Sequence, residues 1–197
     1  MLAGNPHYDA IAEHYGGRRA ERSGGRRAER SGVLLIRHVD EGLLVLDAIG
    51  APLVAREAYC LHPLLQGDAE LAAAFLPGSV LHRHAIRPHA VALAMEYRAV
   101  ANAYLSHRII ADASEIALGP LPEVRQMLIA DKAQNRKDFE RHHAATHPRA
   151  RELDRYFRLW LERLGVSEAE YLRFVAIMDA AARPDGPGKT APSDLMA

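Results

Sequence analysis

Cysteine is almost absent from this chain of 197 residues, and Cys60 is the only one. A single thiol excludes an internal disulfide and is compatible with a reducing compartment. The neighbours of Cys60 are apolar, which favours a buried thiol that packs in the core over a reactive nucleophile. The sequence therefore gives no support to thiol chemistry.

An excess of charge of one sign and long apolar segments are missing as well. The chain has 25 Lys and Arg against 25 Asp and Glu, so its formal net charge is zero, and we do not expect nucleic acid as a partner. No segment approaches the roughly 20 consecutive apolar residues that a membrane span needs. The first residues also lack a basic stretch followed by an apolar run, which argues against a signal peptide. We expect a cytoplasmic protein with no membrane contact.

An arginine-rich loop is expected at 17–32, where the eight residues Gly-Arg-Arg-Ala-Glu-Arg-Ser-Gly occur twice in succession without change. A tandem duplication that lengthens a surface loop costs little loop-closure entropy. The alternative is that the added arginines change what the loop binds. Residues 184–197 are rich in Pro, Gly and Ser, and we expect a disordered tail there, after one helical domain at 1–183.

Helix signals dominate the remaining sequence, so the predicted fold class is all-α. Asn5-Pro6 is typical of an N-cap followed by the first helical residue, and Ser167 with Glu170 forms a capping-box pattern. Apolar residues at helical spacing, with Pro and Gly at the boundaries, predict further helices. The expected helices are at 6–14, 39–49, 52–65, 68–75, 88–106, 122–147, 149–164 and 168–182. Only 33–36 has the composition of an extended run.

Three short segments carry residues that could bind a metal ion. They are Arg-Ser-Gly-Val-Leu-Leu-Ile-Arg-His at 30–38, Cys-Leu-His-Pro at 60–63 and Ile-Ala-Asp-Lys-Ala-Gln-Asn-Arg at 129–136. Neutral imidazoles together with a carboxylate suit a divalent transition metal ion such as Mn, Fe, Zn or Co. A single histidine on a helix is more often a packed or surface residue than a ligand, so each segment alone is a weak signal. Three more histidines, at 142, 143 and 147, are expected at a solvated helix end, where they meet the helix dipole favourably.

In this order and spacing the three segments resemble the hydrolase domain of RelA/SpoT-type ppGpp hydrolases, which belong to the HD superfamily of metal-dependent phosphohydrolases. Residues 25–38 are similar to the glycine–arginine–Ser-Gly loop that leads to the first metal histidine of that family. Leu61-His62 falls where the family has its His-Asp pair, and Ala130-Asp131-Lys132 matches an Ala-Asp-Lys ligand segment. The resemblance covers roughly residues 8–140, with 24 positions from the first histidine to the second and 69 from there to the aspartate. It implies an HD-domain-like helical bundle.

The resemblance also implies roles for individual residues. His38, His62 and Asp131 would be the metal ligands. The residues implied in nucleotide binding are Arg30, Lys132, Asn135 and Arg136. Arg30 would lie against the base, and Asn135 would contact the sugar or phosphate. In that family a metal ion activates water for attack on a pyrophosphate linkage, and arginine suits phosphate because its planar fork donates two hydrogen bonds.

The sequence departs from the family at residues that assist the reaction. Pro63 occupies the position of the aspartate that gives the superfamily its name, which removes one expected metal ligand. Gln66 and Gly67 stand where the family has an acidic pair that manages the attacking water. Asp68 follows one residue later and is the candidate to replace that pair. Three protein ligands can still hold a catalytic metal ion.

Three functions remain open on the sequence alone. The first is a phosphohydrolase that acts on a nucleotide or a related phosphate ester through a divalent transition metal ion. The second is a catalytically inactive nucleotide-binding or regulatory module on the same fold. The third is a helical interaction protein whose arginine loop contacts nucleic acid or an acidic protein. We expect a nucleotide or another phosphorylated small molecule as the ligand, and the sequence is compatible with a homo-oligomer.

Overall fold

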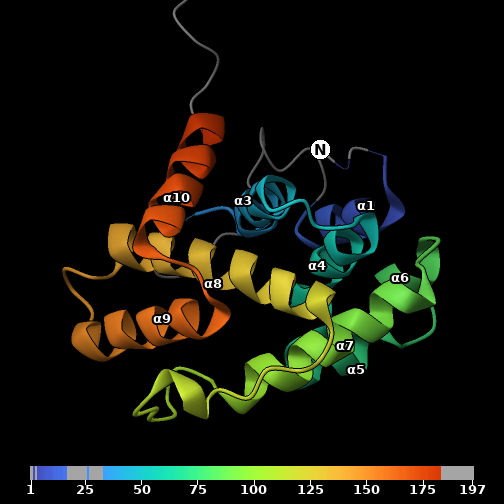
Figure 1. Cartoon of the computed structure of the whole chain (residues 1–197). Helices are drawn as coiled ribbons and strands as arrows, with labels where there is room; N and C mark the ends of the chain where they lie inside the picture. Colours follow the sequence, from blue (N-terminus) through green and yellow to red (C-terminus); the bar gives the residue numbers. More distant parts are fainter. Residues whose placement is uncertain (1, 3, 17–25, 27–32, 183–197) are drawn as a thin grey trace, which may run out of the picture.

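The computed structural model describes residues 2, 4–16, 26 and 33–182. In this part of the chain the backbone forms nine α-helices, one 3-10 helix and no β-strand (Figure 1), which confirms the all-α prediction. The elements are α1 (Pro6–His14), α3 (Leu35–Ala48), α4 (Leu53–Leu65), α5 (Asp68–Ala74), α6 (Val80–Arg83), α7 (Pro88–Ala103), η1 (Ala113–Glu115), α8 (Pro122–His142), α9 (Ala150–Leu164) and α10 (Glu168–Ala182). Within these ranges no helix has the length and apolar character to cross a membrane. The duplicated loop at 17–32, apart from Arg26, and the predicted tail at 184–197 lie outside the described residues.

Most helix boundaries follow local signals in the sequence. Asn5 caps α1 by accepting a hydrogen bond from the backbone N–H of His7. Gly165 ends α9 in the left-handed region, at a φ of 76°, where a side chain would be strained. Ser167 and Glu170 form a capping box before α10, because each side chain accepts a hydrogen bond from the backbone N–H of the other residue. The predicted starts of α1 and α10 and the predicted end of α9 are confirmed.

The prediction of an extended run at 33–36 is wrong for Leu35 and Ile36 only, because Leu34 is extended and forms an isolated β-bridge. Leu35 begins α3, so this helix starts four residues before the expected position. Aliphatic and β-branched residues favour a strand only where a neighbouring strand can pair with them. Here α3 contacts α4 and α8, and packing against these helices determines its conformation.

The longest helix ends earlier than predicted. α8 stops five residues before the expected end at 147. The carbonyl oxygen of Phe139 accepts hydrogen bonds from the backbone N–H groups of both His143 and Ala144, a pattern that closes a helix. The chain therefore turns toward α9 sooner than an uninterrupted helix would allow, and part of the predicted last turn becomes a loop.

α8 is the central element of the bundle. It contacts α3, α4, α7, α9 and α10, and Figure 1 shows it crossing the middle of the molecule. A helix enclosed by neighbours is usually apolar all round, and buried polar groups need hydrogen-bond partners. The buried polar residues of α8 are Asp131, Lys132, Gln134, Arg136 and Lys137. This concentration of polar groups in the interior marks α8 as a place to look for a functional site.

α4 is the other enclosed helix, with contacts to α1, α3, α5, α7 and α8. It carries Cys60, which is fully buried as predicted, and burial raises the pKa of its thiol. A thiol in this setting is inert packing. Two polar residues of α4 are also buried, Glu57 and His62. Glu57 faces the start of α1, whereas His62 faces α3 and α8.

Candidate metal centre

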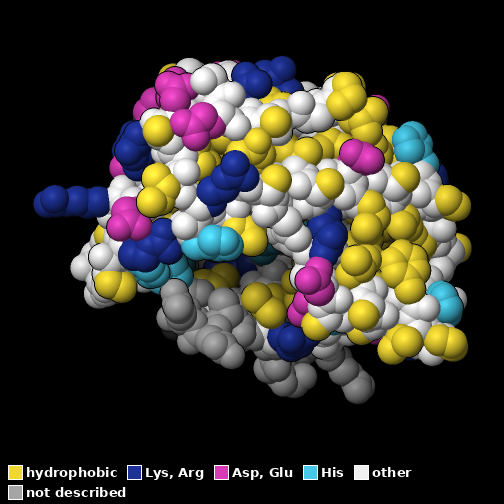
Figure 2. All heavy atoms as spheres, turned by 90° about the horizontal axis from the view of Figure 1, so that it is seen from below, with side chains coloured by type: hydrophobic (Ala, Val, Ile, Leu, Met, Phe, Trp, Pro, Cys, Tyr) yellow, Lys and Arg dark blue, Asp and Glu magenta, His cyan; other side chains and the backbone are white. Residues whose placement is uncertain are grey.

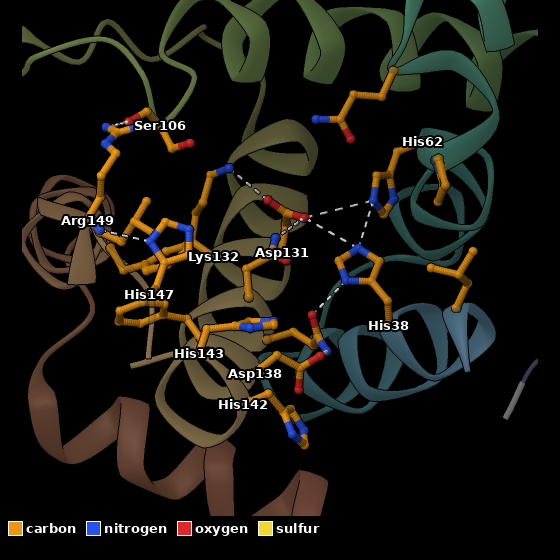
Figure 3. Close-up of a pocket in the computed structure, with 18 of the residues that line it drawn as sticks. His38, His62, Ser106, Asp131, Lys132, Asp138, His142, His143, His147 and Arg149 are labelled. Carbon is orange, nitrogen blue, oxygen red and sulfur yellow. Dashed lines mark hydrogen bonds and ion pairs between the residues drawn. The ribbon is translucent and has the colours of Figure 1, made fainter. Parts of the chain in front are cut away.

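His38 of α3, His62 of α4 and Asp131 of α8 converge on one pocket (Figure 3). One ligand atom from each lies within 4.8 Å of the other two, and this is the one such His, Cys, Asp or Glu cluster in the described part of the chain. The Nε2 atoms of the two histidines are 3.0 Å apart. Asp131 Oδ1 lies 3.4 Å from His38 Nε2 and 3.9 Å from His62 Nε2. The structure thus brings together the three residues that were expected to meet, and their role as ligands stays a prediction.

The two histidines meet because α3 and α4 approach closely at Gly42. A Cβ atom at this position would overlap the ring of Tyr59 on α4. The centroid of the Tyr59 ring in turn lies 4.5 Å from that of His62 and 6.0 Å from that of His38. Protein interiors are densely packed, so a larger residue in place of Gly42 would push the helices apart and separate the histidines.

A polar network between α3 and α8 fixes the orientation of His38. The side-chain amide of Gln134 donates its two N–H groups to Glu41 at 3.0 Å and to Asp138 at 2.8 Å. The amide oxygen therefore faces His38, and it lies 2.6 Å from Nδ1. Because this oxygen can only accept, Nδ1 carries a proton, and in the neutral ring Nε2 presents a lone pair to the pocket. Metal-binding histidines are held in the same way, by a hydrogen bond from the second ring nitrogen.

The backbone holds His62 in the same tautomer. Its Nδ1 lies 2.6 Å from the carbonyl oxygen of Tyr59, which can only accept. Nδ1 therefore donates, and Nε2 presents its lone pair toward His38 and Asp131. Burial, with a further contribution from His38, lowers the pKa of His62 to about 3, so the ring is neutral at pH 7.

Three electron-rich atoms consequently face one another, the two Nε2 atoms and Asp131 Oδ1. Burial alone would raise the pKa of Asp131, but neighbouring groups, Lys132 first among them, hold it well below its usual range, so the carboxylate is ionised. Lone pairs that face each other across 3.0 Å repel unless a proton or a cation lies between them. In its neutral form each ring carries its proton at Nδ1. A divalent cation therefore fits this set of two imidazole nitrogens and one carboxylate oxygen.

Lys132 supplies a fixed positive charge beside these atoms. Its Nζ lies 2.9 Å from Asp131 Oδ2 and 4.9 Å from the centroid of the Trp160 ring, over whose face a cation is attracted. Burial would lower the pKa of Lys132, but Asp131 outweighs this and raises it, so the ammonium stays charged. The charge of Asp131 is therefore balanced within the protein.

The pocket has a volume of about 1200 Å³, enough for a small-molecule ligand. Figure 2 shows a hollow with a histidine side chain at its rim on the face seen from below. Beyond the three converging residues, the end of α8 and the loop before α9 line the pocket with His142, His143, His147 and Arg149. These histidines were expected at a solvated helix end. His142 is the exposed last residue of α8 and His143 is its C-cap, so this expectation is confirmed for these two, and all three histidines also lie along the pocket (Figure 3).

Of the described residues implied in nucleotide binding, two line the pocket and one does not. Lys132 and Asn135 line the pocket, and Asn135 Nδ2 donates to Asp131 Oδ1 at 2.9 Å. Arg136 does not line it. Its buried guanidinium binds Glu140 and Glu168 and so joins α8 to the start of α10. Arg136 therefore lies away from this pocket, on a different side of the helix, and its role in nucleotide binding stays a prediction.

The remaining candidates lie outside the pocket or outside the described residues. The Asp68 side chain is 95 % exposed, pairs with Arg98 and is not among the residues that line the pocket. The weak prediction that it replaces the missing acidic pair is therefore corrected. Arg30 lies outside the described residues, and its contact with a base stays a prediction. Pro63 and Gln66 do line the pocket, where the resemblance implies acidic residues.

Sequence reasoning missed the residues that orient His38. A polar stripe was visible in the sequence, since Asp131, Gln134, Asp138 and His142 recur every three or four residues and share one helix face. That spacing could have placed Gln134 and Asp138 in the site. Glu41 gives no such signal, because it is 93 residues away from the amide that it binds.

Comparison of the chain with known protein families, with curated proteins and with solved structures finds no match. No relative or neighbour therefore supplies a ligand or an activity by analogy. The resemblance to HD phosphohydrolases stays an expectation drawn from the sequence segments, and the case for a function rests on the pocket.

Proposed function

We propose that this protein is a metal-dependent phosphohydrolase that acts on a nucleotide or a related phosphate ester. One observation carries the proposal: Nε2 of His38, Nε2 of His62 and Oδ1 of Asp131 face one another with separations of 3.0 to 3.9 Å, and the Nδ1 atom of each ring is held by an oxygen acceptor on the other side of the ring. A divalent ion such as Mn, Fe, Zn or Co suits these donors. Three protein ligands also leave coordination positions open, as catalytic metal sites do.

The charges around the pocket support an anionic substrate. Lys132 balances Asp131, so the carboxylate offsets little of the charge of a bound cation. A divalent ion held there would keep most of its positive charge, and a negatively charged ligand would stabilise it. A phosphate group meets this requirement and is small enough to reach the base of the pocket.

The chain's own residues hold the arrangement ready for such a substrate. A bound divalent ion would supply Lewis acidity and an activated water molecule. Gln134 keeps the Nε2 lone pair of His38 directed into the pocket, and Asn135 limits the rotation of the Asp131 carboxylate. Lys132 has three N–H donors, and its pair with Asp131 leaves a donor for a phosphate oxygen.

The test combines metal analysis with a phosphate-release assay. Protein purified without chelator should contain a stoichiometric transition metal and release phosphate from at least one member of a panel of nucleotides and phosphate esters. His62→Ala and Asp131→Asn should lose both properties. His89→Ala is the matched control, because His89 is an exposed histidine of α7 outside the pocket. No bound metal and no phosphate release across the panel would overturn the proposal.

A second candidate, a nucleotide-binding module without turnover, is favoured by one specific observation. Apart from Asp131, Asp138 is the one carboxylate among the described residues that line the pocket. Its oxygens are engaged by Gln134 at 2.8 Å and Lys137 at 2.9 Å, so it is poorly placed to take a proton from water. This candidate predicts bound metal and a higher melting temperature with nucleotide, but no phosphate release.

A further inference from the structure

Pro63 stands inside α4, directly after His62. Proline has no backbone N–H, so it cannot donate the helical hydrogen bond to the carbonyl four residues earlier. In an uninterrupted helix the carbonyl of Tyr59 would accept the N–H of residue 63. Proline at this position therefore releases the Tyr59 carbonyl from the hydrogen bonds of the helix.

His62 takes the place of the missing donor. Its Nδ1 lies 2.6 Å from the Tyr59 carbonyl oxygen, a short hydrogen bond. The imidazole is 1 % exposed, so water does not compete for this contact. The bond keeps the ring proton at Nδ1 and leaves Nε2 as an acceptor that faces His38 and Asp131.

We propose that Pro63 is a positioning residue: by removing a backbone donor, it frees the Tyr59 carbonyl to hold His62 in the tautomer that can bind a metal ion through Nε2. This inference deepens the proposed function and rests on it for the identity of the ligand. The tautomer itself is a property of the metal-free protein. Where the resemblance implies a metal ligand, this chain thus has a residue that orients one.

If Pro63 had only a structural role, its replacement should affect stability but not metal affinity. Proline inside a helix lowers stability, so replacing it should stabilise α4 whatever else it does. If Pro63 had no role in orienting His62, metal affinity would be unchanged by the replacement. A positioning role predicts that stability rises while metal affinity falls, and these opposite directions separate the two roles.

The test uses full-length, metal-free protein and the variant Pro63→Ala. Nitrogen NMR of the imidazole rings reports the tautomer. His62 should be the Nδ1–H form in the natural protein, and the Nε2–H form should become populated in Pro63→Ala, because the new N–H competes for the Tyr59 carbonyl. Titration with Zn²⁺ should show an affinity weakened by about 10- to 100-fold, the range for loss of a residue that orients a ligand. The melting temperature of the metal-free variant should rise.

Pro88→Ala is the matched control. Pro88 lies in the first turn of α7, where its missing N–H breaks no helical hydrogen bond, so Zn²⁺ affinity and the His62 tautomer should not change. An Nε2–H form of His62 in the natural protein, or an unchanged tautomer and affinity in Pro63→Ala, would overturn the inference. A tautomer change in a protein that binds no Zn²⁺ would uphold the role of Pro63 and count against the proposed function.

Discussion

Two clusters of buried histidine and carboxylate involve α4, and they differ in which atoms have partners. The first joins Glu57 to His7 of α1, with Nδ1 3.7 Å from Oε1. His7 Nδ1 also lies 2.9 Å from the side-chain oxygen of Asn5, and its Nε2 accepts the backbone N–H of Arg87 at 3.0 Å. Both ring nitrogens of His7 therefore have partners within the protein.

The second cluster contains the same residue types with the opposite pattern. In His38 and His62 the Nδ1 atoms have acceptors, while the Nε2 atoms face each other and Asp131. A buried histidine whose two ring nitrogens are both paired within the protein, as in His7, needs no ligand. Lone pairs directed at one another inside the protein are stabilised by a cation. The pairing of both ring nitrogens, rather than residue type, thus separates a packed histidine from a candidate metal ligand.

Replacing the carboxylate of each cluster should give the largest difference between the clusters, in the free energy of unfolding. Asp131→Ala leaves Lys132, whose side chain is 7 % exposed, without its partner, and breaking a buried ion pair costs about 3–5 kcal/mol. Glu57→Gln leaves an amide that can still bind Asn5, and the Arg87 side chain is 57 % exposed, so the cost should be about 1–2 kcal/mol. Chemical denaturation of both metal-free variants measures the two losses. Equal losses of unfolding free energy in the two variants would contradict the difference drawn between the two clusters.

The second largest difference should be in Zn²⁺ affinity, between variants that lack His62 and variants that lack His7. His62→Ala deletes a proposed ligand and should weaken Zn²⁺ binding by more than about 100-fold, beyond the cost of losing a residue that only orients a ligand. His7→Ala should lower stability, because it leaves the Arg87 backbone N–H without its acceptor, and should not change the affinity. Calorimetric titration of each variant checks this. A similar loss of affinity in both would show that the His7 cluster takes part in metal binding.

Acid should destabilise the metal-free protein through the same residues. Unfolded His62 takes up a proton near pH 6.5 and folded His62 only near pH 3, so between these values the unfolded state binds more protons and stability falls as the pH falls. The slope for one such group is at most about 1.4 kcal/mol per pH unit. Burial lowers the pKa of His7 too, with the same sign. Urea denaturation at a series of pH values should show a flatter slope for His62→Ala than for His7→Ala; the reverse order would contradict the pKa of about 3.

The helices could be predicted where their signals are local. Asn5, Gly165 and Ser167 define helix ends through bonds or backbone angles within a few residues, so a short stretch of sequence is enough to recognise them. The second half of the run at 33–36 misled because it lies in α3, whose conformation depends on contacts with α4 and α8, far along the chain. Local propensity is weak against such tertiary packing.

In the candidate site, too, some features could be predicted from the sequence and others depend on distant contacts. The order and spacing of His38, His62 and Asp131 predicted that they meet, and the structure brings them together. Gln134 points toward His38, and Arg136 is buried on a side of the helix away from the pocket. Both directions depend on distant partners, a glutamate of α3 for Gln134 and Glu168 for Arg136. Helical spacing gives the relative directions of residues on one helix but not which side faces the interior.

The smallest expected effects concern the asparagine that each cluster contains. Asn5 Nδ2 donates to Glu57 at 3.0 Å, and Asn135 Nδ2 donates to Asp131 at 2.9 Å. Asn5→Ala should cost about 1 kcal/mol through the lost cap of α1, with unchanged Zn²⁺ affinity. Asn135→Ala should weaken Zn²⁺ binding by about tenfold, because the carboxylate loses a bond that orients it. Since both clusters contact α4, a tenfold effect of Asn5→Ala in the same titration would mean that this helix couples them, and the separation drawn between a packed cluster and a metal centre would fail.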